Sequence, residues 1–164
     1  MNQASLERLR GPLYLVAAIF VLTPCVDIIA NVAPLHFQVA AWRFGATGVA
    51  SNYLISIVFG AALAMTVAIT SGTRFTMRTL GVLGMLAAMA LLLASVYLLL
   101  DMLQLRGQVP SESLDAFQTG GWKTFFKLVS TALALGTIAL ALFRAAAQAR
   151  SAAAAAFLIS EQKA

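Results

Sequence analysis

The stretch "LGVLGMLAAMALLLASVYLLL", residues 80–100, contains no charged side chain. The hydrocarbon core of a bilayer is about 30 Å thick, and an α-helix rises about 1.5 Å per residue. About 20 apolar residues in a row are therefore enough to cross it. This segment predicts a transmembrane helix, and it decides the fold class before any other part of the chain is considered.

Three further stretches have the same character, at approximately residues 11–29, 48–69 and 125–143. Hydrophobic residues make up 61% of the 164-residue chain and charged residues only 10%, whereas soluble domains carry about 25% charged residues. We therefore expect an all-α, polytopic integral membrane protein in which residues 1–164 form one membrane domain, a four-transmembrane-helix bundle. The first stretch is longer than the usual signal-peptide core of about 7–15 residues and lacks a clear cleavage site, which predicts that it is retained.

The basic residues predict how the chain is oriented in a bacterial-type inner membrane. Four spans place both termini and the middle connection on one side, and cytoplasmic segments are enriched in Lys and Arg. That side carries seven basic residues and the opposite side four. Both termini are therefore expected in the cytoplasm. The seven residues are Arg8, Arg10, Arg74, Arg78, Arg144, Arg150 and Lys163.

The connections between the spans have distinct compositions. "PLHFQVAAWRFGATG", residues 34–48, predicts a short interfacial helix from Leu35, with Gly45 and Gly48 permitting a bend into the second span. In residues 104–123, Pro110 and Ser111 predict the start of a short helix that Gly120–Gly121 would end. Residues 144–164 are rich in alanine, the best helix former. They are expected either to extend the fourth span as a cytoplasmic helix or to form a frayed tail.

Small residues predict where the helices meet, because apolar side chains gain little by leaving lipid for one another. The second span carries a stripe with a four-residue spacing, and the third carries two glycines on one face. Internal packing and an oligomer interface are both compatible with this pattern, and internal packing is favoured. The predicted packing residues are Gly48, Asn52, Ser56, Gly60, Ala64, Gly81 and Gly84.

Two acidic residues lie within or close to the spans. Asp27 follows Pro24, which disturbs the helical bond to the carbonyl of residue 20. A carboxylate at membrane depth often marks an ion or proton path. The favoured alternative is that Asp27 reaches the interface and pairs with Arg43 or caps a neighbouring helix. For Asp101, near the end of the third span, the expected partners are Arg106, Lys123 or Lys127.

Residues 34–48 also contain His36 and Trp42, for which two interpretations are open. The first is an interfacial hinge, with the tryptophan at the headgroup level. The second makes the pair a contact for a haem, a pigment or a quinone, because a neutral imidazole serves as an axial ligand. The first is favoured, since the chain has a single histidine. The predicted interfacial anchors are Trp42, Arg43, Trp122 and Arg144.

The residue inventory limits the function classes. One cysteine, Cys25, cannot form an intrachain disulfide or a Cys-x-x-Cys centre. No nucleophile–base pair, metal-ligand set or phosphate loop is recognisable, so catalysis is not expected. The basic residues stand singly at the ends of apolar runs, which argues against nucleic-acid binding.

We expect a non-catalytic accessory subunit that contacts lipid, pigment or other membrane subunits, with no required cofactor. The alternative is an oligomeric transporter or channel protomer that uses Asp27.

Overall fold

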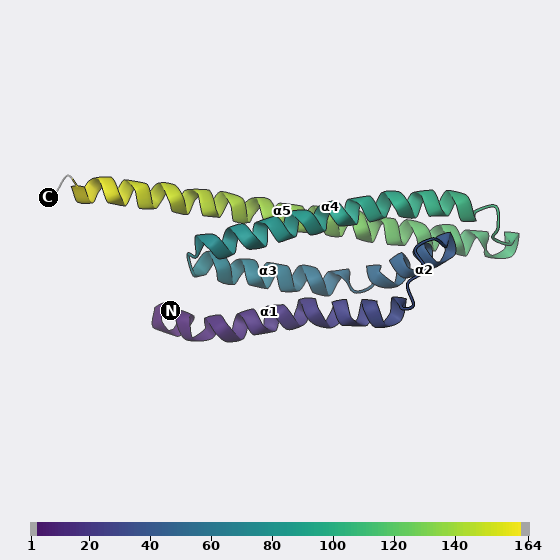
Figure 1. The fold of residues 1–164 in the computed structure, drawn as a ribbon, viewed down its shortest axis with the longest axis horizontal. Helices are drawn as coiled ribbons and strands as arrows, with labels where there is room; N and C mark the ends of the chain where they lie inside the picture. The colour runs from purple at the N-terminus through teal and green to yellow at the C-terminus, as the bar shows by residue number, and fades with distance from the viewer. Residues whose placement is uncertain (1–2, 162–164) are drawn as a thin grey trace.

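The computed structural model describes the backbone of residues 3–161 and the side chains of residues 9–149 and 151. The regular structure of this part of the chain is helical, with no strand, and its long helices run side by side (Figure 1). The elements are α1 (Gln3–Val32), α2 (Ala40–Ser51), α3 (Leu54–Thr70), α4 (Arg74–Leu105), the 3-10 turn η1 (Ser111–Ser113) and α5 (Leu114–Glu161).

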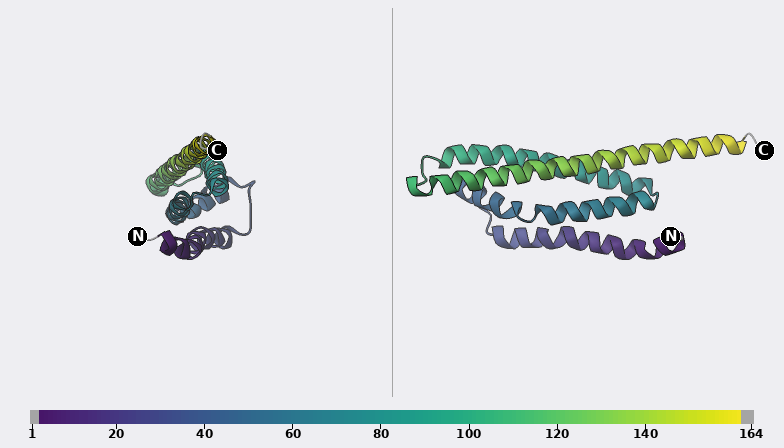
Figure 2. Two further views of the ribbon diagram at one scale, coloured as in Figure 1. Left: turned by 90° about the vertical axis from the view of Figure 1, so that its left-hand side faces the viewer. Right: turned by 180° about the vertical axis from the view of Figure 1, so that it is seen from behind.

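The helices form two closely packed pairs that α3 connects. Helix α4 packs along α5, and α1 packs along α3, which in turn contacts α5 and α4. Helix α2 leans on α4 and α5 at the end of the molecule opposite the N-terminus. Figure 2 shows from behind that α5 extends past the other helices at the end where the chain begins. The two ends of the chain therefore lie at the same end of the molecule.

Length and composition make these helices suitable for a membrane. Three helical segments are long and apolar enough to cross one: Leu9–Val32, Arg74–Leu105 and Ser111–Ala149. Helices α2 and α3 qualify together as a fourth, with a 48° bend between them. These apolar helices support a membrane protein with transmembrane segments.

The break in the second span differs from the predicted one. Helix α2 begins at Ala40 rather than Leu35, and the bend falls at Asn52–Tyr53 rather than at Gly45 or Gly48. The N–H groups of Asn52 and Tyr53 bond to carbonyls three residues back, at 3.1 Å each, and the Ser51 hydroxyl donates to the Gly48 carbonyl at 2.7 Å. The Ser51 hydroxyl bond and the tightened turn at Asn52–Tyr53 thus interrupt the regular helix and bend the span there. The prediction that the bend lies at Gly45 or Gly48 was wrong.

The expected stop at Gly120–Gly121 was also wrong, because α5 passes through both residues. A Cβ atom on Gly121 would lie 2.5 Å from Sδ of Met102 on α4. This glycine therefore allows α4 and α5 to approach each other and does not end a helix. At its other end α5 runs to Glu161, so the alanine-rich segment is helical to that point. Residues 162–164 lie outside the described part of the chain.

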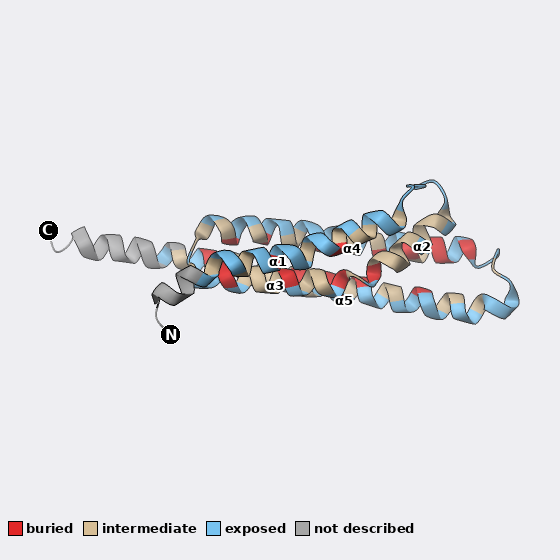
Figure 3. Ribbon diagram, turned by 90° about the horizontal axis from the view of Figure 1, so that it is seen from below, coloured by how far each residue is buried: buried red, intermediate tan, exposed pale blue. Residues whose placement is uncertain are grey.

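Close contacts between α4 and α5 provide most of the interior. A Cβ atom on Gly84 would lie 3.3 Å from the Ala139 methyl group, and Leu98, Leu128 and Leu142 are almost fully buried. Helix α1, in contrast, is exposed over much of its surface (Figure 3). The molecule thus has a narrow interior and a large apolar exterior, as expected for a protein whose solvent is lipid.

Candidate functional site

A buried ion pair joins α2 to α4. Asp101 is 2% exposed, and its carboxylate accepts two hydrogen bonds from the Arg43 guanidinium. One runs from Nε to Oδ2 at 3.1 Å and the other from Nη2 to Oδ1. Arg43 also donates through Nη1 to the carbonyl of Phe37, at 2.8 Å. One guanidinium therefore fixes α2 and the connection before it against the end of α4.

This pairing corrects two predictions from the sequence. Asp101 does not pair with Arg106, Lys123 or Lys127, and Asp27 does not pair with Arg43. Helix α2, which carries Arg43, packs more on α4 than on α1, so the guanidinium lies within reach of Asp101. An arginine fork matches a carboxylate in two parallel bonds and stays charged when it is partly buried. The pair has the geometry of a structural clamp.

Further polar contacts surround the break between α2 and α3. Lys127 on α5 donates to the Asn52 side-chain oxygen at 2.7 Å. Asn31 at the end of α1 donates to the Asp27 carbonyl at 2.8 Å and to the Tyr53 hydroxyl at 3.5 Å. The break is thus held from both neighbouring helices.

Pro24 has a partner in the adjacent helix. A proline lacks the N–H that would bond to the carbonyl four residues earlier, here that of Phe20. The Ser56 hydroxyl of α3 donates to this carbonyl at 3.1 Å. Lipid offers no water to replace a missing backbone bond, so such a carbonyl needs a partner within the protein. The pairing connects two residues that the sequence singled out separately.

We expect Ser56→Ala to lower the stability of the protein by about 1 kcal/mol, because it removes the partner of the Phe20 carbonyl. The same substitution in a Pro24→Ala background is expected to have almost no effect, since alanine supplies the helical N–H. Thermal unfolding in detergent of the four variants measures this coupling. Equal losses in both backgrounds would contradict it.

Asp27 lies close to the end of α1 and is half-buried. Within the described side chains it forms no ion pair. Pro24, one turn earlier, is buried. The two residues predicted as a possible intramembrane site therefore lie in different surroundings, the proline in the contact with α3 and the aspartate towards the end of the helix.

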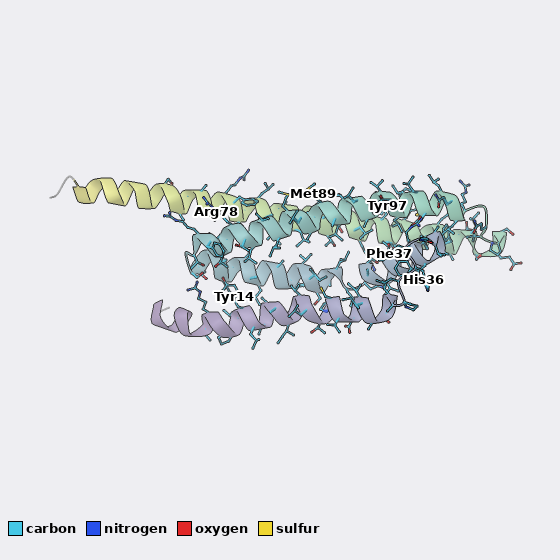
Figure 4. All side chains as sticks on the ribbon, viewed as in Figure 1. Tyr14, His36, Phe37, Arg78, Met89 and Tyr97 are labelled. Atoms are coloured by element: carbon cyan, nitrogen blue, oxygen red, sulfur yellow. The ribbon has the colours of Figure 1, made fainter. Side chains whose placement is uncertain are left out.

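His36 and Trp42 do come together, in the region where Figure 4 labels His36 and Phe37. Their ring centroids are 6.4 Å apart at 88°, and Phe37 meets the same tryptophan at 5.2 Å and 81°. His36 is exposed and Trp42 half-buried. Among the described residues, no three His, Cys, Asp or Glu side chains gather where they could hold a metal ion. The three rings form a compact aromatic cap beside the start of α2.

The predicted packing residues are distributed over several contacts. A Cβ atom on Gly60 would lie 2.7 Å from Val21 Cγ2 and 2.8 Å from the Ala17 carbonyl, so α1 and α3 touch there backbone to backbone. Gly81 lies against the Phe143 ring and Gly84 against Ala139. Gly48 has open space around it and Asn52 is exposed. The stripe therefore divides at the break after Ser51, and only its α3 part faces α1.

Of the predicted anchors, the two tryptophans lie at the end of the molecule that contains the ion pair. Trp122 is 48% exposed and packs on Phe125 and Phe126. Arg43, expected to reach headgroups, is instead committed to Asp101. Arg144 is exposed on α5.

Sequence reasoning missed an apolar groove between α1 and the other helices. Its volume is about 430 Å³, and side chains of α1, α3, α4 and α5 line it. Small residues form much of its floor, among them Ala18, Gly60, Ala64 and Gly84. Tyr14 lines it too, and the Tyr14 hydroxyl is buried without a hydrogen-bond partner among the described residues. The small-residue pattern marked these positions, but nothing in the sequence indicated that they leave space open.

No model of a known protein family matches this chain, and neither a curated protein nor a solved structure matches it.

Proposed function

We propose that the chain is a four-transmembrane-helix bundle of a bacterial-type inner membrane, with both termini in the cytoplasm. The count of basic residues supports this orientation, although three of them, Arg8, Arg150 and Lys163, have side chains outside the described part. In a Cys25→Ser background, a cysteine placed at Ser71 is expected to react with an impermeant maleimide only after lysis. One placed at Ser113 is expected to react in intact spheroplasts.

We infer that the protein is a non-catalytic accessory subunit of a larger membrane assembly. The observation that carries this proposal is a seam on α1, which we define as Leu15, Ile19, Leu22, Val26 and Ile29. The intervals between successive members alternate between four and three residues. Each member is between 53% and 67% exposed. The seam faces away from the α3 contact, so no part of this chain described by the structure covers it.

The spacing of the seam favours a helix over lipid as its neighbour. A four–three alternation of branched apolar residues matches the knobs-into-holes packing of two helices at a shallow angle. Lipid chains require no such regularity. The ionised pair of the interior, Arg43 and Asp101, is engaged in holding the helices together. A transmembrane helix of another subunit is therefore the partner that we propose for the seam.

A photo-crosslinking amino acid at Val26 tests the proposal in native membranes. We expect one discrete adduct with a membrane protein that also co-purifies with the unmodified chain in fixed stoichiometry. The matched control is the same amino acid at Leu93 on α4, which is 61% exposed and lies outside the seam. It is expected to give lipid adducts only.

Two other results would overturn the accessory proposal. Lipid adducts alone at both positions would make the seam an ordinary lipid-facing surface. An adduct at Val26 with twice the mass of the chain would indicate a homo-oligomer, as the transporter alternative requires. In that case the measurement to make is transport by the Asp27→Asn variant.

A further inference from the structure

We propose that the groove between α1 and α4 binds one chain of an anionic phospholipid, with the lipid's ester carbonyl at Tyr14 and its phosphate at Arg10. This site belongs to the isolated chain and needs no partner subunit, although Leu22 of the α1 seam also borders the groove. The shape of the groove, the Tyr14 hydroxyl and the distribution of charge each support it.

The groove has the lining that a hydrocarbon chain requires. It is bordered by aliphatic side chains of four helices. Gly60 and Gly84 also line it, and they leave space because they have no side chain. A helix packed there would need the close backbone approach that Leu80 and Leu83 prevent, because both line the groove from α4. A flexible acyl chain fills such a space without those constraints, and in a bilayer it is the most abundant apolar molecule.

Tyr14 is the only residue with a polar side chain among those that line the groove. Its buried hydroxyl lacks a partner among the described residues, and an unsatisfied hydroxyl in an apolar environment is costly. Tyr14 itself lines the groove, so a ligand there lies beside its ring, and rotation about the Cα–Cβ bond is the motion that turns the hydroxyl towards that ligand. An ester carbonyl accepts the hydrogen bond that the phenol would donate.

Arg10 lies where the phosphate of the same lipid would be. It precedes Tyr14 by four residues, so the two share a face of α1 about 6 Å apart along the axis. Phosphate lies outward of the ester groups by a similar step. Arg10 donates through Nη2 to the Thr73 hydroxyl at 3.2 Å, a neutral partner, and no acidic side chain among residues 9–149 forms an ion pair with it. The guanidinium of Arg10 would therefore offer a phosphate oxygen both a positive charge and N–H donors.

The charge of this end of the molecule favours an anionic headgroup. Figure 4 shows Arg78 at the same end as Tyr14, and Arg74 and Arg144 belong to the same level of the helices. The acidic residues whose side chains are described lie towards the other end: Asp27, Asp101, Glu112 and Asp115. Glu7 and Glu161 are outside the part with described side chains. Basic clusters at a membrane surface attract anionic lipid.

Lipid retention by the purified full chain tests the site. Detergent-solubilised protein is titrated with palmitoyl-oleoyl phosphatidylglycerol or with the phosphatidylcholine of the same chains, and bound lipid is counted by native mass spectrometry. We expect one phosphatidylglycerol to bind about tenfold more tightly than phosphatidylcholine. Tyr14→Phe is expected to weaken phosphatidylglycerol binding about fivefold, the equivalent of one neutral hydrogen bond.

Three further variants separate the groove from a general basic surface. Arg10→Gln is expected to remove the preference for phosphatidylglycerol. Ala18→Phe is expected to block retention of both lipids, because Ala18 lines the groove yet is exposed, so the larger side chain leaves the α1–α3 contact intact. Arg78→Gln removes a charge at the same end of the molecule but outside the groove lining, and it is expected to weaken phosphatidylglycerol binding much less than Arg10→Gln. Tyr97→Phe, at an exposed tyrosine of α4, is the matched control for Tyr14→Phe and is expected to behave like the wild type.

Two results would overturn the proposal. The first is equal retention of both lipids by the wild type, Tyr14→Phe and Ala18→Phe. The second is a preference for phosphatidylglycerol that Arg10→Gln and Arg78→Gln reduce alike while Ala18→Phe leaves it unchanged, since this indicates headgroup binding on the surface.

Discussion

Replacing Arg43 with methionine is expected to cause the largest loss of stability of any single change at the α2 end of the molecule. The substitution leaves the carboxylate of Asp101, whose side chain is only 3% exposed, without its partner. Stranding one charge of a buried ion pair costs about 3–5 kcal/mol. It also leaves the Phe37 carbonyl without its donor. Thermal unfolding in detergent, followed by circular dichroism and size-exclusion chromatography, measures the loss.

The opposite substitution is expected to be milder. Asp101→Leu leaves a guanidinium whose side chain is 29% exposed and long enough to reach headgroups or water. The double variant, Arg43→Met with Asp101→Leu, is expected to recover most of the stability, because apolar side chains replace both charges. Arg43→Lys is the conservative control and retains the charge but not the two-bond fork. Similar losses in both single variants and no recovery in the double variant would contradict the clamp.

Much of the fold was predictable because it depends on long-range composition rather than on local detail. Residues 80–100 required a helix of membrane length, and α4 contains the whole segment. The other apolar stretches likewise fall within α1, the α2–α3 pair and α5. Lipid imposes internal backbone hydrogen bonding on every such stretch, so hydropathy alone is sufficient.

The connections were not predictable in the same way, because glycine has more than one structural role. Gly120 and Gly121 have the composition of a helix stop, yet α5 passes through them and Met102 occupies the space that a side chain on Gly121 would fill. The bend of the second span arises instead at Asn52–Tyr53, where the sequence shows no Gly or Pro. Only the neighbours in three dimensions show whether a glycine ends a helix or allows two helices to approach each other closely.

Individual residues of the candidate site could be predicted from the sequence, but the contacts between them could not. Pro24 and Ser56 were each singled out, but their connection through the Phe20 carbonyl requires the register of α1 against α3. Asp101 was expected to pair with a cation near it in sequence, whereas its partner lies 58 residues earlier. Tyr14 was not singled out, because a tyrosine near a membrane surface is ordinary until its hydroxyl is found buried and unsatisfied.

Gly60 is expected to be the position at which a larger side chain does most damage to the attachment of α1. A single methyl group there would lie 2.7 Å from Val21 Cγ2 and 2.8 Å from the Ala17 carbonyl. The carbonyl belongs to the backbone, so the whole helix would have to shift. Overpacking of this kind costs about 1–3 kcal/mol, which is the loss expected for Gly60→Ala. Gly60→Leu is expected to separate α1 from α3, with a corresponding rise in amide exchange along α1.

Gly48→Ala is the matched control, because it belongs to the same predicted stripe but has open space within 4 Å. Alanine in place of a helical glycine favours the helix by about 0.5–1 kcal/mol, so this variant is expected to be as stable as the wild type or slightly more stable. The α1–α3 contact also includes the Ser56 hydrogen bond, which Gly60→Leu would break at the same time. Unchanged unfolding temperatures and unchanged exchange along α1 in Gly60→Leu would show that α1 is not held at this crossing.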